Sequence, residues 1–215
     1  MDLPIMSAMK RRSERETAQL EDDVVNALFS ITSEIALHGG TAVWRCYGGK
    51  RFSKDLDIYL WAKDFKLMFM EAMEKAGIDV AKYREKGITF IHVRKGNTEI
   101  KVEPRNAEKA AVLAPYEKID GSRMNILVLS PEDIILEKIK AYNDRRAYKD
   151  LYDITVLMNH VKDQGRVRKA LHAFAADMKK PDESFQAYDE FRTLIYSGTV
   201  PSFENMSEML RRWAL

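Results

Sequence analysis

The sequence predicts an α+β protein, in which a small mixed β-sheet with helices is followed by an α-helical C-terminal domain. Strand patterns and helix patterns alternate up to Ser130, and only helix patterns follow it. Hydrophobic residues make up 46% of the 215 residues and charged residues 32%, which supports a packed core and excludes a disordered chain. We therefore expect a core domain over 1–130, with a basic N-terminal extension over about 1–15, and a helical domain over 131–215.

The first domain is expected to begin with a helix after its frayed basic extension. Leu20, Val24, Leu28 and Ile31 form the apolar stripe of this helix. A strand then runs into Gly39-Gly40, and a later helix over 64–76 stops at Gly77. The expected order is a strand over 34–38, a helix over 41–47, a strand over 54–60, the helix over 64–76, and strands over 89–93, 98–103 and 125–129. A turn over 94–97 joins two of these strands into a hairpin.

The second domain begins at a clear helix start, Ser130-Pro131-Glu132-Asp133. Serine caps the helix, proline suits the first helical position, and the two acids face the positive end of the helix dipole. Helices are expected over 131–145, 147–161, 165–178, 183–196 and 203–213.

The charge is nearly balanced overall but not along the chain. Lys and Arg number 35 against 33 Asp and Glu, a net charge of +2. Residues 136–180 hold eleven Lys and Arg against six Asp and Glu, which suits a polyanion, or simply a solvated helical surface. A lone cysteine, Cys46, points to a reducing cytoplasm, and no apolar run is long enough to span a membrane.

Two carboxylates mark the strand over 54–60. Alternation sends Asp55 and Asp57 to one face and Leu56, Ile58 and Leu60 to the other. The two acids would lie roughly 7 Å apart and repel each other unless a cation lies between them. Oxygen ligands favour Mg²⁺ or Mn²⁺ over zinc. The alternative is two exposed acids on an edge strand.

The segment Gly39-Gly40-Thr41 stands where a strand runs into a helix. Backbone N–H groups at such a helix start, together with the Thr41 hydroxyl, can hold a phosphate, and glycines let a ligand approach closely. A plain turn is the alternative.

Further candidates lie later in the chain. If the strand over 98–103 neighbours the acidic strand, Glu103 or Glu99 could complete the metal site, or could equally belong to a solvated face. Lys138 lies in the middle of an apolar helix face, and Asp150 points inward from the next helix. These two residues predict either a buried ion pair or a place in the active site, where Asp150 orients Lys138.

Two blocks of the sequence form recognisable motifs. The first block is Gly39-Gly40-Thr41-Ala42-Val43, Tyr47-Gly48, then Arg51, Ser53, Asp55, Asp57 and Ile58. The second is Glu137-Lys138, Ala141, Arg145, then Lys149-Asp150-Leu151-Tyr152-Asp153-Ile154. Both blocks resemble the AbiEii/AbiGii-type toxins of the DNA polymerase β-like nucleotidyltransferase superfamily, with Lys149 where the family usually has Arg.

The resemblance implies a nucleotidyltransferase whose helical domain contributes to the nucleotide-binding groove. A nucleoside triphosphate (NTP) would be held by Gly39, Gly40, Thr41, Arg51, Ser53 and Lys138, with Asp150 also in the active site. Asp55, Asp57 and Glu103 would hold the metal. The implied acceptor is the 3′ end of tRNA, and the implied protein partner is an antitoxin. Transfer to a protein side chain, or a non-catalytic nucleotide- or RNA-binding module on the same fold, are the alternatives.

Overall fold

The computed structural model describes residues 4–85, 89–107, 109–181 and 185–214. The chain divides into two compact units. The sheet unit comprises Met1–Cys46 and Phe52–Leu129, and the helical unit comprises Tyr47–Arg51 and Ser130–Leu215. The short segment Tyr47–Arg51 thus clusters with helices that begin about eighty residues later in the chain.

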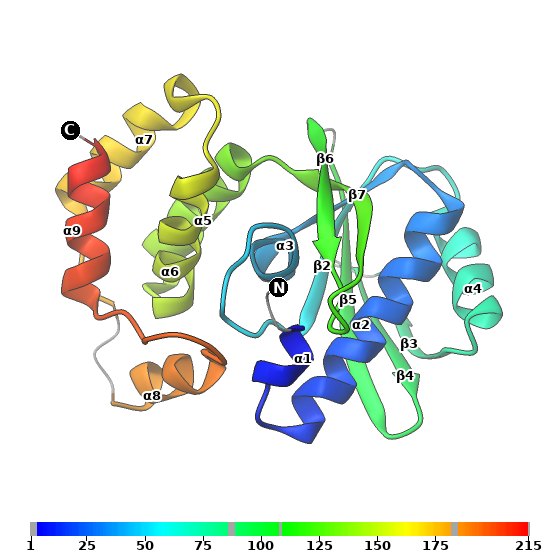
Figure 1. Ribbon diagram of the computed structural model, residues 1–215. Helices are drawn as coiled ribbons and strands as arrows, with labels where there is room; N and C mark the ends of the chain where they lie inside the picture. Colours follow the sequence, from blue (N-terminus) through cyan, green and yellow to red (C-terminus); the bar gives the residue numbers. More distant parts are fainter. Residues whose placement is uncertain (1–3, 86–88, 108, 182–184, 215) are drawn as a thin grey trace. The chain divides into compact units, whose positions relative to one another are not determined.

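Within the described residues, the sheet unit contains one seven-stranded sheet in the order β3-β4-β5-β2-β1-β7-β6 (Figure 1). β1 pairs in parallel with β7 and β2 in parallel with β5, whereas the other neighbours are antiparallel. This mixed sheet confirms the predicted α+β class. The strands are β1 (Ile35–His38), β2 (Asp55–Leu60), β3 (Asp79–Arg84), β4 (Phe90–Lys95), β5 (Thr98–Asn106), β6 (Ala111–Glu117) and β7 (Arg123–Leu129).

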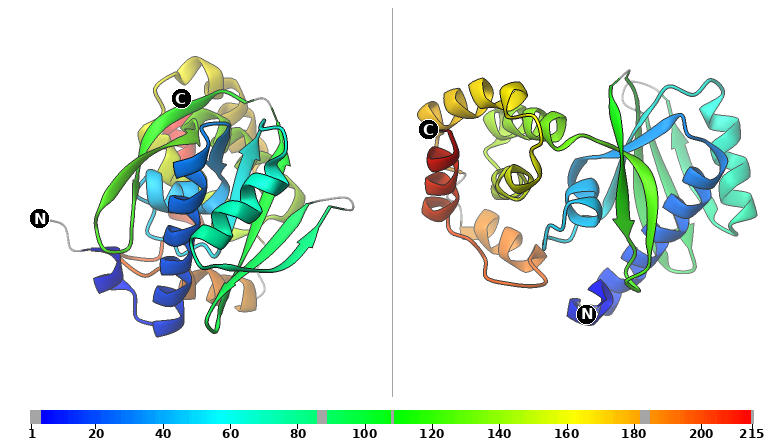
Figure 2. Two further views of the ribbon diagram at one scale, coloured as in Figure 1. Left: turned by 90° about the vertical axis from the view of Figure 1, so that its right-hand side faces the viewer. Right: turned by 45° about the horizontal axis from the view of Figure 1, so that its top comes forward.

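Helices cover both faces of this sheet. The helices are α1 (Ile5–Ala8), α2 (Arg12–Ile31), α3 (Gly39–Cys46) and α4 (Phe65–Lys75). α2 and α4 lie on one face and the short α3 lies on the other (Figures 1 and 2). The predicted stripe of α2 buries Leu20, Val24 and Leu28, but Ile31 in the last turn stays 41% exposed.

The prediction of a basic, frayed N-terminal extension over about residues 1–15 is wrong for the described residues of this segment. Residues Ile5–Ala8 form the turn α1, and α2 already begins at Arg12. Ile5 and Met9 are buried, and the Met6 N–H donates to the Ile119 carbonyl at 3.0 Å. Two apolar side chains among many charges were enough to dock this segment on the sheet unit.

Two strands, β3 and β6, were not predicted. Both are edge strands of the sheet. Most side chains of β3 are exposed, so its sequence lacks the apolar alternation of a half-buried strand. β6 contains Pro115, which argues against a central strand but is tolerated at an edge, where one side of the backbone has no partner strand.

The helical unit follows the predicted pattern closely. α5 (Pro131–Arg145) starts where expected, because the Ser130 hydroxyl accepts a hydrogen bond from the Asp133 N–H at 3.2 Å. The helices that follow are α6 (Tyr148–Leu157), the 3₁₀ turn η1 (Met158–His160), α7 (Gln164–Asp177), α8 (Phe185–Leu194) and α9 (Phe203–Ala214).

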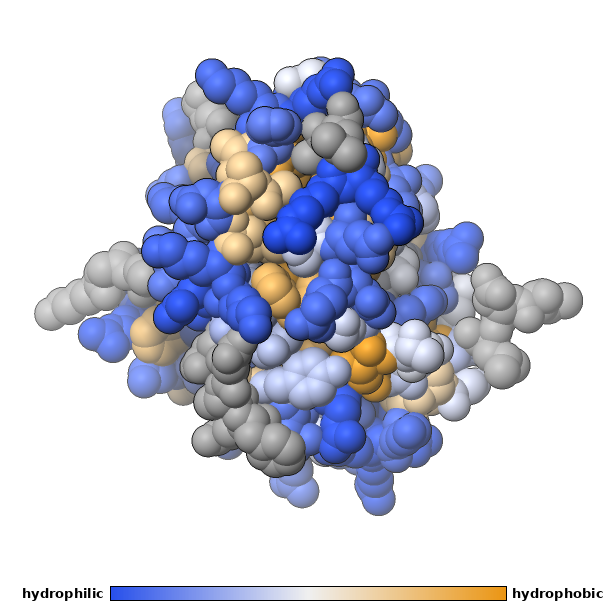
Figure 3. Space-filling view, turned by 90° about the vertical axis from the view of Figure 1, so that its left-hand side faces the viewer, coloured by the Kyte–Doolittle hydropathy of each residue, from blue (hydrophilic) through white to orange (hydrophobic). Residues whose placement is uncertain are grey.

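Most of the surface that is visible in Figure 3 is hydrophilic, with small hydrophobic patches. Large apolar side chains that stay exposed on the helical unit include Leu136 and Met209, at 37% and 45%. None of the helices in the described residues is long and apolar enough to cross a membrane.

Candidate active site

The acidic strand β2 has the two faces that its alternation predicted. Leu56 and Ile58 are buried in the core, while Asp55 and Asp57 are half-buried on the opposite face. The neighbouring strand β1 runs antiparallel, with His38 opposite Asp57. Because His38 is followed directly by Gly39, this pairing brings the start of α3 to the acidic pair.

Gly39 and Asp57 lie in direct contact. A Cβ atom on residue 39 would lie 2.1 Å from the Oδ2 atom of Asp57, far inside any real contact distance. Gly39 also has a φ of +71°, a left-handed conformation that glycine adopts without strain. Only glycine therefore allows β1 to turn into α3 while the Asp57 carboxylate keeps its place.

Thr41 has a different role from the one we expected for its side chain. It is fully buried, and its hydroxyl donates to the backbone carbonyl of Asp55 at 2.7 Å. This hydroxyl is therefore occupied in joining α3 to β2. The backbone N–H groups of Gly40 and Thr41, in the first turn of α3, remain the candidate phosphate donors.

The parallel pairing of β2 with β5 decides between Glu99 and Glu103. Register places Glu103 opposite Asp57 and Lys101 opposite Asp55, so these side chains share one face. Glu99 lies near the start of β5, before the residues that pair with β2, and contacts His92 at 2.6 Å. Of the two candidates, Glu103 is therefore the one beside the acidic pair.

Glu103 is engaged by two cations. Its carboxylate contacts Lys101 and also Arg105, whose nearest nitrogen is 3.4 Å away. Burial alone would raise the pKa of Glu103, but its hydrogen bonds and charge contacts, first with Lys101 and then with Arg105, hold it below its ordinary value. Among the described residues, no group of three or more His, Cys, Asp and Glu side chains is arranged to hold a metal ion.

The donor chemistry nevertheless fits a hard cation. Asp55, Asp57 and Glu103 offer only oxygen atoms from two neighbouring strands, which is the donor set that magnesium and manganese prefer. Asp55 and Asp57 are the first two candidate ligands. Glu103 could join them only by exchanging its contacts with Lys101 and Arg105.

A second cluster of charges lies in the helical unit. Lys138 of α5 is 8% exposed, and its Nζ lies 2.7 Å from Asp153 and 3.4 Å from Asp150, both on α6. Arg145 donates two hydrogen bonds to Asp150, each at 2.7 Å. The predicted Lys138–Asp150 pair exists, but the shorter contact of Lys138 is to Asp153.

Asp153 was missed as a candidate, although it stands one helical turn after Asp150. This spacing places both carboxylates on one face of α6, where both are fully buried. Burial would raise the pKa of Asp153, but the charges of Arg51 and then Lys138 outweigh burial and lower it. Asp153 is therefore a buried anion that depends on these two cations.

Arg51 has a structural partner where we expected a nucleotide contact. It is 5% exposed and holds Asp153 with two hydrogen bonds, at 2.9 and 2.8 Å. Because this bidentate ion pair engages the guanidinium group of Arg51, the structure does not support the direct contact of Arg51 with a nucleotide that we expected. Ser53, the other residue expected from the same motif, is half-buried in the loop before β2.

The segment Tyr47–Arg51 is attached to the helical unit by further bonds. The Lys50 N–H donates to the Tyr152 hydroxyl at 2.8 Å, and the Tyr196 hydroxyl donates to the Gly49 carbonyl at 3.2 Å. With the Arg51–Asp153 pair, these contacts join two sequence blocks that lie about a hundred residues apart.

Cations outnumber acids among the described residues of this cluster. Lys138, Arg145 and Arg51 face the two aspartates, and Lys149 adds a fourth cation. Partial burial, and then the charges of Arg145 and Arg51, lower the pKa of Lys149. The cluster can therefore attract an additional anion.

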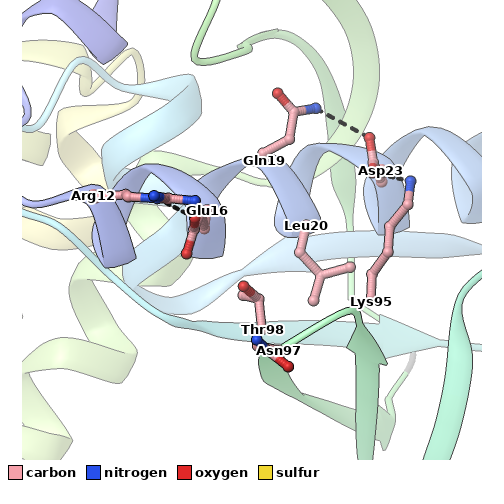
Figure 4. Close-up of a pocket in the computed structure, with 8 residues that line it drawn as sticks. All are labelled: Arg12, Glu16, Gln19, Leu20, Asp23, Lys95, Asn97 and Thr98. Atoms are coloured by element: carbon pink, nitrogen blue, oxygen red, sulfur yellow. Dashed lines mark hydrogen bonds and ion pairs between the residues drawn. The ribbon is translucent and has the colours of Figure 1, made fainter.

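A surface groove of about 650 Å³ lies elsewhere, between α2 and the β4–β5 hairpin (Figure 4). Its charges pair with one another: Arg12 with Glu16 at 2.7 Å and Lys95 with Asp23 at 2.8 Å. This groove does not include the acidic pair, and it offers no unmatched charge to a ligand.

Solved structures share this fold. MenT4, a nucleotidyltransferase toxin from Mycobacterium tuberculosis H37Rv, has a TM-score of 0.62 at 19% identity, over 95% of this chain and 84% of that chain. JHP933 from Helicobacter pylori has a TM-score of 0.64 at 19% identity, over 95% of this chain and 91% of that chain. No curated protein matches the chain. These likenesses show that the chain shares the fold of these proteins.

A family model described as "Nucleotidyl transferase AbiEii toxin, Type IV TA system" matches residues 26–211. The chain belongs to this AbiEii family and is a nucleotidyltransferase of the toxin type. The family match confirms the resemblance that the motifs around Gly39, Asp55 and Asp150 indicated.

Proposed function

We propose that the protein transfers a nucleoside monophosphate from an NTP to a hydroxyl at the 3′ end of tRNA, and that the transfer depends on a divalent cation. The observation that supports this most strongly is the acidic pair on β2, with Asp57 packed against Gly39 at the start of α3. Such an arrangement combines metal ligands with backbone phosphate donors in one place.

Asp55 and Asp57 are the proposed ligands of Mg²⁺ or Mn²⁺, with Glu103 as the third carboxylate. When bound, the cation would polarise the reacting phosphate and lower the pKa of the attacking hydroxyl. For Glu103 to contribute, Lys101 and Arg105 must release its carboxylate. They would then be free to contact the phosphates of the bound nucleotide or of the acceptor.

The NTP phosphates are proposed to bind two sets of donors. The backbone N–H groups of Gly40 and Thr41 provide one set, and Lys138 provides the other. Asp150 and Asp153 orient Lys138, while Lys149 adds positive charge to the cluster. In this scheme Arg51 is a positioning residue that acts through Asp153.

In the proposed step, the acceptor oxygen forms a bond to the α-phosphorus. The bond from that phosphorus to the oxygen of the leaving pyrophosphate breaks, and the hydroxyl proton passes to solvent. A tRNA acceptor would place the enzyme in the cytoplasm, in line with its lone cysteine, Cys46. The proposed protein partner is the antitoxin of the same toxin–antitoxin pair.

The test supplies each α-labelled NTP in turn, with total RNA in one series and protein extract in the other. We expect magnesium-dependent labelling of tRNA that falls at least about a thousandfold in Asp57→Asn, because a catalytic metal contributes several kcal/mol to the transition state. The matched control is Asp79→Asn, which removes an exposed carboxylate from the edge strand β3.

Each other outcome has a definite meaning. If only the protein extract is labelled, the acceptor is a protein side chain and not tRNA. No label in either series, with retained NTP binding, would make the chain a non-catalytic nucleotide-binding module. Equal loss in Asp57→Asn and Asp79→Asn would contradict the role of the acidic pair.

A further inference from the structure

The sheet face that holds the acidic pair extends across three more strands. Register places Lys101 of β5 opposite Asp55, and His92 of β4 opposite Lys101. On β3, Lys82 lies opposite His92, and Arg84 lies opposite Phe90 of β4. Because register partners point to the same side of a sheet, all these side chains lie on the face of Asp55 and Asp57.

An aromatic ring on this face is surrounded by cations. The Phe90 ring is half-buried, and the charged groups lie 5.2 Å (Lys82), 5.6 Å (Arg84) and 5.9 Å (Lys101) from its centroid. We call Lys82, Arg84, Phe90 and Lys101 the Phe90 patch. α3 packs on the part of this face formed by β1, β2, β6 and β7, and the ends of Lys82 and Arg84 remain exposed.

The charge of the Phe90 patch is not balanced. Lys82 and Arg84 form no ion pair with any acid in the described residues. Other cations of the same strands have acidic partners: Lys95 contacts Asp23 at 2.8 Å, and Arg94 contacts Asp79 at 4.0 Å. The face is thus acidic on β2 and carries unmatched positive charge on β3.

We propose that the Phe90 patch binds single-stranded RNA, with an unpaired base on the Phe90 ring and its neighbouring phosphates on Lys82 and Arg84. An aromatic platform beside cations is the usual chemistry of single-strand recognition, since every base has a face that can stack. The proposal rests on the proposed nucleotidyl transfer and assigns the site that holds the acceptor strand.

The position of the Phe90 patch suits an RNA strand whose end reaches the acidic pair. A strand held on β3 and β4 would run over Lys101 toward Asp55 and Asp57 on the same face. The cations on β3 would offset the repulsion between the RNA and the acids of β2. A base-paired strand could not stack on Phe90, so the site selects an unpaired end.

The experiment measures binding of the full-length chain to a fluorescein-labelled single-stranded RNA of about eight nucleotides by fluorescence anisotropy. Neither NTP nor divalent metal is added. The variants are Phe90→Leu, Phe90→Trp and the double variant Lys82→Gln/Arg84→Gln. Lys75→Gln is the control, since Lys75 is an exposed cation at the end of α4, which packs on the opposite face. Circular dichroism and thermal midpoints verify folding.

We expect Phe90→Leu to weaken binding by about 5- to 100-fold, the range that loss of one stacked base implies, and Phe90→Trp to restore it. The double variant should reduce the slope of log Kd against log salt by about 1.4, or about 0.7 for each lost phosphate contact. Lys75→Gln and wild type should bind alike, and a duplex of the same sequence should bind more weakly than the single strand.

Unchanged binding in Phe90→Leu would overturn the proposal, as would an equal loss in Lys75→Gln or tighter binding of the duplex. Transfer of nucleotide to a protein, with no RNA binding, would assign the acceptor to another class. Because this assay needs no catalysis, its failure leaves the Asp57→Asn transfer test untouched, and the reverse also holds.

Discussion

The Asp57 carboxylate occupies the space that any side chain on residue 39 would need. The turn from β1 into α3 uses a left-handed backbone at Gly39, and the same position must leave room for the carboxylate of Asp57, 18 residues later in the chain. One glycine therefore serves both the turn and the site. This makes Gly39 a sharper test of the acidic pair than a change to the acids themselves.

We predict that Gly39→Ala loses the magnesium response of the protein as well as stability. The added methyl group must displace Asp57, and the positive φ costs about 1–3 kcal/mol for a residue with a side chain. Differential scanning fluorimetry with and without magnesium measures both effects. Wild type should gain stability with magnesium, because the ion binds only the native state, and Gly39→Ala should not.

Gly77→Ala is the matched control for this prediction. Gly77 has a φ of +65°, but a Cβ atom there would meet nothing within 4 Å. This variant should lose stability through backbone strain and keep the full magnesium response. A normal magnesium response in Gly39→Ala would contradict the contact between residue 39 and the metal site.

At the level of helices, α5 and α6 bury more charge than their apolar stripes suggest. Asp150 and Asp153 face inward from one turn of α6, and three cations from two other segments surround them. Removing one partner of such a buried pair leaves an uncompensated charge, which costs about 3–5 kcal/mol. The cluster therefore fixes the orientation of Lys138.

We expect Lys138→Met to weaken NTP affinity by about 10- to 100-fold, since a charge-assisted contact contributes roughly 1.5–3 kcal/mol. Isothermal titration calorimetry gives the affinity. Lys140→Met is the control, because Lys140 is an exposed cation on the same helix. If Lys138 only completes the ion cluster, a folded Lys138→Met protein should lose stability but keep the affinity of wild type.

The ion pairs of Asp153 with Arg51 and Lys138 also make the free energy of unfolding depend on pH. The lowered pKa means that the folded carboxyl binds its proton more weakly than the unfolded one, whose pKa is near 4. Its stabilisation is therefore complete above about pH 4 and is lost as pH falls through the lower folded pKa. Urea unfolding at a series of pH values should show Asp153→Asn about 3–5 kcal/mol less stable at pH 7, with a gap that narrows in acid.

Asp177→Asn is the control, because it removes an exposed carboxylate of α7. Its free energy of unfolding should equal that of wild type at every pH. If the difference in free energy of unfolding between wild type and Asp153→Asn stays constant down to pH 2, the carboxyl is not an anion held by Arg51 and Lys138.

Over the whole molecule, the net charge of +2 conceals a strong local separation of charge. The basic excess over 136–180 and the unmatched cations of the Phe90 patch both attract polyanions, whereas the acidic pair repels them. A near-neutral protein of this kind can bind RNA locally without binding it indiscriminately.

We predict that tRNA binding by the wild-type protein weakens by about tenfold between 50 and 200 mM salt, as two or three phosphate contacts imply. A filter-binding series measures the dependence. Affinity that stays flat over this range would argue against an RNA acceptor and for a protein or small-molecule acceptor.

The features that the sequence alone determined are those set by neighbours along the chain. Alternation placed Asp55 and Asp57 on one face, the Ser130 cap started α5, and the hairpin around Gly96 joined β4 to β5, because each depends on a few adjacent backbone angles and polar groups. The family resemblance added the chemistry, because its motifs are local as well.

Only the tertiary structure decided the contacts between distant segments. It placed Glu103 rather than Glu99 beside Asp57, turned Arg51 toward Asp153, and brought Phe90 onto the face of the acidic pair. The edge strands β3 and β6 also escaped prediction, since exposed strands lack an apolar pattern. Strand order and register follow from how the whole core closes, and no short stretch of sequence encodes that choice.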